Sequence, residues 1–124
     1  MLKIGMASVF VEDQEKALKF YTETLGFVKK MDVPTGDYRW LTVTDELGQF
    51  ELLLEPNVHP AAKAYQKAIF KDNIPATSLM VDDIDKEYER LMAKGVRFVV
   101  PPTKMEWGMY AIFDDTCGNL INIA

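Results

Sequence analysis

The chain has 124 residues, of which 48% are hydrophobic and 27% are charged, which is typical of one globular domain with a packed core. Its formal net charge of -5 excludes a protein that binds the nucleic-acid backbone through a basic face. No apolar run approaches the roughly 20 residues of a membrane span, the first residues lack the pattern of a secretory signal, and the single cysteine, Cys117, cannot form an internal disulfide. We therefore expect a cytoplasmic protein, stabilised by packing, with no nucleic-acid or membrane partner.

The first half of the chain predicts a strand, a helix and three further strands. The opening apolar run, MASVFV, has the length of a strand, and Asp13 follows it as a candidate helix N-cap, because its carboxylate can accept hydrogen bonds from the first-turn amides. Leu18, Tyr21 and Leu25 then follow at helical spacing. Gly26 is the expected end of this helix. Turn-like segments separate three further strand-like runs, at residues 27–32, 38–45 and 50–56.

A connector of residues 57–73 follows, in which residues 61–70 (AAKAYQKAIF) predict a short helix that begins after Pro60. The second half then repeats the pattern of the first about 70 residues later. Asp83 is the second candidate N-cap, and Gly95 is the second helix end. Three strand-like runs complete the repeat, at residues 96–100, 109–115 and 119–124.

Each half is therefore expected to form a βαβββ module, which gives an α+β fold. The boundaries that we expect are residues 1–56 for module one, 57–73 for the connector and 74–124 for module two, within a single domain. A module of this size cannot cover both faces of its own sheet, so the two modules must cover each other or pair with a second chain. The sequence leaves both arrangements open.

Three segments carry a family resemblance: VFVEDQEKALKFYTETLGF, VDDIDKEYERLMAKGV and DDTCGNLINI. Together they resemble the glyoxalase I, bleomycin resistance protein and extradiol dioxygenase superfamily, also called vicinal oxygen chelate proteins. The resemblance covers nearly the whole chain. It implies two tandem βαβββ modules that form an open, cupped mixed sheet with the helices outside, a homodimer, and a ligand pocket inside the cup.

In the enzymes of that superfamily a divalent metal is held by His on the first strand and Glu on the last strand of each module. The resemblance places four residues of this chain at those positions: Met6, Leu52, Ala76 and Asn122. These side chains cannot hold a hard cation firmly, so we expect neither a metal nor another cofactor. A slip of one residue would bring Glu51 to the position of Leu52, with its side chain on the opposite face. The only histidine, His59, is expected in a surface loop of the connector.

Alternation along the strands predicts which side chains share the face of the cup. Two aromatic stretches, GDYRW and MEWGMY, add rings that could form its rim, although burial of Trp40 and Tyr110 in the strand core is the alternative. The predicted ligand-binding residues are Met6, Ser8, Phe10, Trp40, Leu52, Ala76, Ser78, Met80, Trp107, Tyr110 and Asn122.

Three functions are compatible with these features. The first is metal-independent binding of a small organic molecule, including a cationic one, as the resemblance to bleomycin resistance proteins implies. The second is a lyase or dioxygenase-type enzyme that acts on a small metabolite, with Glu51 as a base or a weak metal site. The third is a non-catalytic regulatory module whose cup is filled by its own side chains. The sequence decides neither whether the protein is an enzyme nor which ligand it binds.

Overall fold

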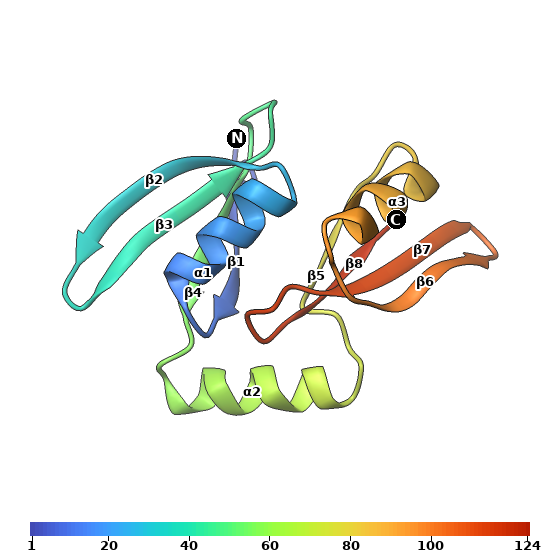
Figure 1. Cartoon of the computed structure of the whole chain (residues 1–124). Coiled ribbons are helices and arrows are strands. Elements are labelled where there is room, and N and C mark those ends of the chain that lie inside the picture. Colours follow the sequence, from blue (N-terminus) through green and yellow to red (C-terminus); the bar gives the residue numbers. More distant parts are fainter.

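The computed structural model describes residues 1–124, which form two similar halves joined by a helix (Figure 1). The first half contains β1 (Met6–Val11), α1 (Gln14–Lys19), the π-helical turn η1 (Phe20–Thr24), β2 (Val28–Thr35), β3 (Tyr38–Thr44) and β4 (Glu51–Pro56). Helix α2 (Pro60–Lys71) joins it to β5 (Thr77–Leu79), α3 (Ile84–Ala93), β6 (Phe98–Met105), β7 (Gly108–Asp114) and β8 (Leu120–Ile123). No helix is both long enough and apolar enough to cross a membrane.

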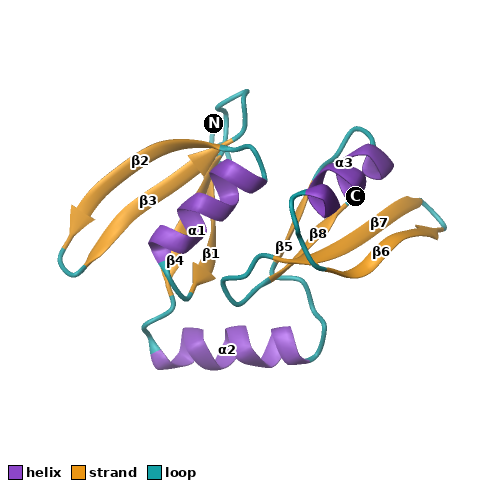
Figure 2. Ribbon diagram, viewed as in Figure 1, coloured by secondary structure: helices purple, strands orange, loops and turns teal.

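The strands form two separate four-stranded sheets (Figure 2). Sheet A has the order β1-β4-β3-β2, and sheet B has the order β5-β8-β7-β6. In each sheet the first strand pairs in parallel with the last strand, and the remaining pairs are antiparallel. The predicted α+β fold of two βαβββ modules is confirmed, and the free edges of β1 and β5 are not hydrogen-bonded to each other.

The helices begin and end where the local chemistry predicts. The side chain of Asp13 accepts a hydrogen bond from the Lys16 amide at 2.9 Å, and Asp83 does the same for Lys86 at 3.1 Å. The predicted glycine ends of the first and last helices take a positive φ without a Cβ clash, at Gly26 (φ 91°) and Gly95 (φ 84°). The predicted connecting helix is also confirmed, as α2.

One hydrophobic core joins the two halves of the chain. It includes Val11 and Leu54 of sheet A together with Phe113 and Ile121 of sheet B, all almost completely buried. Helix α1 lies between the two sheets (Figure 1), and the ring of Phe20 lies 6.1 Å from the ring of Phe113. The two sheets therefore bury their helix-covered faces against a shared core, and the opposite face of each sheet is left uncovered.

A buried polar cluster links the halves beside this core. The hydroxyl of Tyr21 donates a hydrogen bond to the Asp115 carboxylate at 2.6 Å, and the same carboxylate accepts from the backbone amides of Cys117 and Asn119. Burial, together with this carboxylate, raises the pKa of Tyr21 well above its usual range. Burial likewise raises the pKa of the Cys117 thiol to about 12, so this thiol stays protonated.

Helix α2 is held to both halves by Gln66. Its Nε2 donates to the carbonyl oxygen of Phe10 at 2.8 Å, and its Oε1 accepts from the Asn57 amide group at 2.7 Å. The second half approaches so closely that a Cβ on Gly118 would lie 2.7 Å from Gln66 Nε2. Since every buried polar atom of this cluster has a partner, the connector is a fixed part of the fold.

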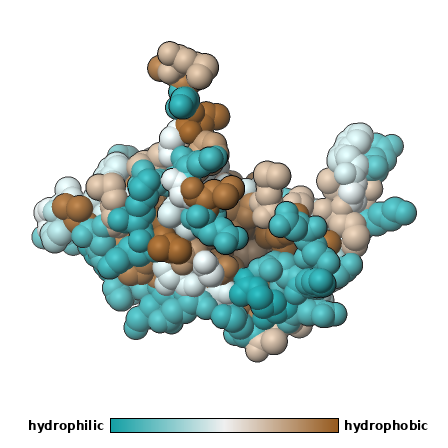
Figure 3. Space-filling model, turned by 90° about the horizontal axis from the view of Figure 1, so that it is seen from above, coloured by the Kyte–Doolittle hydropathy of each residue, from teal (hydrophilic) through white to brown (hydrophobic).

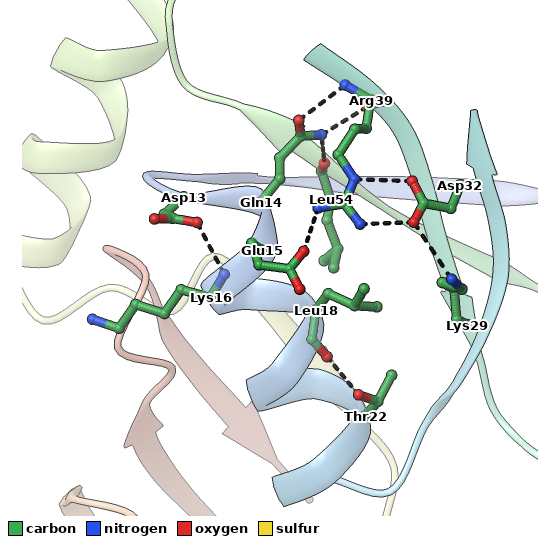
Figure 4. Close-up of polar contacts among 10 residues, drawn as sticks. All are labelled: Asp13, Gln14, Glu15, Lys16, Leu18, Thr22, Lys29, Asp32, Arg39 and Leu54. Carbon is green, nitrogen blue, oxygen red and sulfur yellow. Dashed lines mark hydrogen bonds and ion pairs between the residues drawn. The ribbon is translucent and has the colours of Figure 1, made fainter. Parts of the chain in front are cut away.

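Helix α1 is seated on sheet A by a second polar group (Figure 4). Gln14 Nε2 donates to the carbonyl oxygens of Arg39 at 2.7 Å and Leu54 at 2.9 Å. The Arg39 guanidinium forms two parallel hydrogen bonds with Asp32, at 2.9 and 2.7 Å, and a third contact of 2.7 Å with Glu15. These contacts fix the position of α1 over β2 and β3.

The pairing with Arg39 lowers the pKa of Asp32 from its ordinary value of 3.8 to about 2. Because the folded-state pKa is depressed, the stabilisation is present above about pH 4 and is lost as the pH falls towards about 2.

We expect Asp32→Asn to lower the free energy of unfolding by about 1 kcal/mol at pH 7. The difference from wild type should shrink between about pH 4 and pH 2, measured by urea unfolding at each pH. Asp37→Asn, in the exposed β2–β3 turn, is the control and should show no such convergence; parallel pH profiles for wild type and Asp32→Asn would contradict the assignment.

Candidate functional site

The face of sheet A that points away from α1 is called open face A. Strand alternation and the pairing register put side chains from all four strands on it. They include Met6, Ser8, Phe10, Met31, Val33, Trp40, Thr42, Glu51, Leu53 and Glu55. Their neighbours along the strands, such as Val9 and Leu54, point into the core.

Open face A combines aromatic rings with carboxylates. Trp40 is 40% exposed and Phe10 is half-buried, and Glu55 is the cross-strand partner of Phe10. The Glu51 carboxylate accepts a hydrogen bond from the Thr42 hydroxyl at 2.9 Å and lies 3.7 Å from the Lys30 ammonium. Because Lys30 pairs only with Glu51 and leaves Glu55 without an ion-pair partner, the face has a net negative character and can hold a flat organic cation against its rings.

The face of sheet B that points away from α3 is called open face B, and it is less charged. Ser78, Ile112 and Asn122 are neighbours across β5, β8 and β7, and the amide of Asn122 donates to the Ser78 hydroxyl at 2.8 Å. Tyr110 is half-buried on the same face, and Met80, just after β5, is 96% exposed. Asn122 is thus a polar contact on an uncovered face.

The structure changes the register that the sequence suggested for β4. Asn122 pairs with Ser78, and Ser8, which occupies the place of Ser78 in the first half, pairs with Leu53. Leu53 is therefore the counterpart of Asn122, whereas Leu52 lies on the helix-covered face against the core. The physical reason is that the β3–β4 loop, residues 45–50, is one residue longer than the β7–β8 loop, residues 115–119.

The donor set does not fit the metal centre of the superfamily's enzymes. With the corrected register the four positions hold a thioether, two aliphatic side chains and an amide, in Met6, Leu53, Ala76 and Asn122. Glu51 lies opposite Met6 on open face A, but no group of three or more His, Cys, Asp and Glu side chains comes together anywhere in the chain. His59 is the exposed N-cap of α2, where its Nδ1 accepts from the Ala61 amide at 3.0 Å.

The predicted ligand-binding residues divide into groups. Met6, Ser8, Phe10 and Trp40 come together on open face A, and Ser78, Tyr110 and Asn122 come together on open face B. Trp107 belongs to neither group, because it lies in the β6–β7 turn and is 81% exposed. Within one chain the two faces belong to separate sheets, although Glu51 of open face A and Ser78 of open face B line one pocket of about 190 Å³.

Sequence reasoning missed the part that α2 plays. A pocket of about 520 Å³ lies between α2 and β1, and its walls include the predicted residues Ser8, Phe10 and Ala76. Most of the remaining wall comes from α2, which the sequence presented only as a connector. The available signal was the spacing of Ala62, Gln66 and Ile69, which puts one face of α2 towards the rest of the protein.

Comparisons with known proteins agree with this architecture. The uncharacterised protein YurT of Bacillus subtilis (strain 168) is 59% identical to this chain over 124 residues. The matched region covers 98% of each of the two chains. The crystal structure of UcmS2 has a TM-score of 0.86 at 32% identity, with 99% of this chain and 97% of that chain covered. TnmS3, an antibiotic binding protein from Streptomyces sp. CB03234, has a TM-score of 0.80 at 32% identity, with 99% and 94% covered.

A family model matches residues 3–123, which is nearly the whole chain and both halves of the repeat. The resemblance that the sequence motifs suggested is therefore confirmed over the full fold. The chain belongs to the Glyoxalase/Bleomycin resistance protein/Dioxygenase superfamily.

Proposed function

We propose that this protein binds a small organic cation on open face A without a metal ion, and that a second copy of the chain completes the site. One observation carries the proposal: the Trp40 and Phe10 rings share an uncovered sheet face with the carboxylates of Glu51 and Glu55. A cation is attracted both to the ring faces and to the carboxylates, and a flat molecule can cover the rings.

The wider charge distribution supports a cationic ligand. The chain carries a formal net charge of -5, which raises the local concentration of small cations around it. On open face A, Lys30 offsets Glu51, while Glu55 has no ion-pair partner. TnmS3 shares this fold at 32% identity and is described as an antibiotic binding protein, which supports the binding of an organic molecule rather than of a metal-activated substrate.

A second copy is proposed because each chain leaves two sheet faces uncovered. Hydrophobic side chains also stand at the surface beside the N-terminal segment (Figure 3). Three of the exposed hydrophobic side chains are Ile4, Leu47 and Phe50, whose exposed fractions are 78%, 75% and 52%. Covering these residues with another chain removes apolar area from water. The open face B of the second copy would then bring its own Ser78, Tyr110 and Asn122 to the ligand on open face A.

If open face A binds an organic cation, a fluorescence titration should detect the binding, and the binding should not require a metal ion. In Trp107→Phe, the only remaining tryptophan is Trp40, so its fluorescence reports on open face A. We expect berberine, a planar organic cation, to quench this fluorescence saturably and equally with and without a chelator. Adding Glu51→Gln should weaken binding about fivefold, because a partly exposed charge contact is worth about 1 kcal/mol.

Glu89→Gln is the matched control, because it removes the same charge from the exposed face of α3. It should leave the affinity for berberine unchanged. A failure of berberine to quench Trp40, a dependence of quenching on added zinc or nickel, or equal losses in Glu51→Gln and Glu89→Gln would each contradict the proposal.

If a second copy completes the site, the protein is a dimer, and a charged side chain introduced into the interface should dissociate it. Sedimentation velocity at micromolar concentration should show a dimer for the wild type and a monomer for Phe50→Lys, because a buried unpaired ammonium is costly. Tyr65→Lys is the control: Tyr65 is 54% exposed, close to the 52% of Phe50, but it lies on α2. A monomeric wild type, or a Tyr65→Lys variant that dissociates as readily as Phe50→Lys, would refute this arrangement.

A further inference from the structure

The pocket between α2 and β1 borders open face A, with which it shares Ser8 and Phe10. It has a volume of about 520 Å³ and lies along the free edge of β1, since no residue of β2, β3 or β4 lines it. Helix α2 forms its other wall and runs across one end of both halves (Figure 1). The exposed side chains of Ile4, Leu47 and Phe50 do not line it.

The walls of this pocket are largely apolar. Phe10 and Tyr65 contribute aromatic rings, and Ile69 contributes an aliphatic side chain. Ala61, Ala62 and Ala76 are small residues, so the space between α2 and the strand is left open. An aromatic molecule of modest size can therefore fill this pocket between two rings.

The amides in the pocket are already used within the protein. Gln66 Nε2 donates to the Phe10 carbonyl oxygen at 2.8 Å, and Asn119 Nδ2 donates to the same oxygen at 2.7 Å. These bonds hold α2, β1 and the β7–β8 loop in fixed positions. The pocket consequently has a rigid wall that does not need a ligand to form.

Three other polar groups remain available to a ligand. The hydroxyls of Ser8 and Tyr65 line the pocket and take part in no side-chain hydrogen bond within the chain. The ring of His59 also lines it, and because its Nδ1 accepts from the Ala61 amide, the proton of the neutral ring lies on Nε2, a free donor. No carboxylate, ammonium or guanidinium group lines the pocket.

We propose that this pocket is a second binding site, for an uncharged aromatic compound that carries a carbonyl or phenolic oxygen. The rings of Phe10 and Tyr65 hold the aromatic part, and the oxygen accepts a hydrogen bond from His59 Nε2. An organic cation is disfavoured here, because the pocket offers no carboxylate to offset the loss of its hydration. The two sites share Phe10 but differ in ligand charge, because neither Glu51 nor Glu55 lines the α2 pocket.

Prodan, an uncharged naphthalene ketone whose emission shifts to the blue in apolar surroundings, is the probe that tests this proposal. We expect saturable binding of prodan to the wild type with a blue shift. Ala61→Phe should fill the pocket and weaken binding by at least about tenfold. Ala64→Phe is the matched control, because Ala64 is exposed on the same helix and does not line the pocket; its affinity should equal that of the wild type. Circular dichroism checks that both variants retain the fold.

His59→Ser tests the hydrogen bond separately from the fold, because serine is also a good helix N-cap. It should weaken prodan binding about fivefold, in line with the loss of one hydrogen bond. The same variant should bind dimethylaminonaphthalene, which lacks the ketone, as well as the wild type does.

The proposal is overturned if prodan fails to bind, if Ala61→Phe and Ala64→Phe bind it equally, or if His59→Ser weakens both probes to the same degree. Glu51→Gln should leave prodan binding unchanged. A loss of berberine binding at open face A, with prodan binding intact, would therefore count against the cation site alone.

Discussion

The arrangement of the whole molecule depends on the core that the two halves of one chain share. Phe20 and Tyr21 lie at its centre, where one ring packs against Phe113 and the other donates its hydroxyl hydrogen bond to Asp115. Both partners of this hydrogen bond are buried, and they belong to different halves, so the halves cannot separate without breaking it. Because the helix-covered face of each sheet packs against this core, no other part of the chain covers the opposite face.

This constraint explains where binding surfaces can exist. Open face A has rings and carboxylates but no opposing wall, and open face B has hydroxyl and amide groups in the same incomplete state. Neither face has an opposing wall within the chain, which is the physical reason for proposing that a second copy takes part. The α2 pocket is different, because a single chain supplies both of its walls and Gln66 locks them together. The two proposed sites therefore differ: the one on open face A is completed by a second chain, and the one beside α2 lies within a single chain.

Features set by local chemistry could be predicted from the sequence. The caps at Asp13 and Asp83, the glycine helix ends and the βαβββ order all depend on neighbouring residues, and all are confirmed. The register of β4 could not be predicted, because one extra residue in the β3–β4 loop shifts the spacing between the two halves without changing the pattern of strand residues. Leu53, rather than Leu52, therefore corresponds to Asn122. Which sheet face is buried also depends on packing between the halves. For the same reason the exposure of Trp40 and the role of α2 as a pocket wall were not visible in the pattern of residues.

The coupling between Tyr21 and Asp115 tests the shared core most directly. A double-mutant cycle of Tyr21→Phe, Asp115→Asn and the combined variant, followed by denaturant unfolding, measures it. If the two halves of one chain pack as described, the effects of the single substitutions on the unfolding free energy will be non-additive by about 1 to 3 kcal/mol, as expected for buried partners in contact. Additivity within about 0.5 kcal/mol would show that the two side chains do not interact, and would contradict the account of how the sheets are placed.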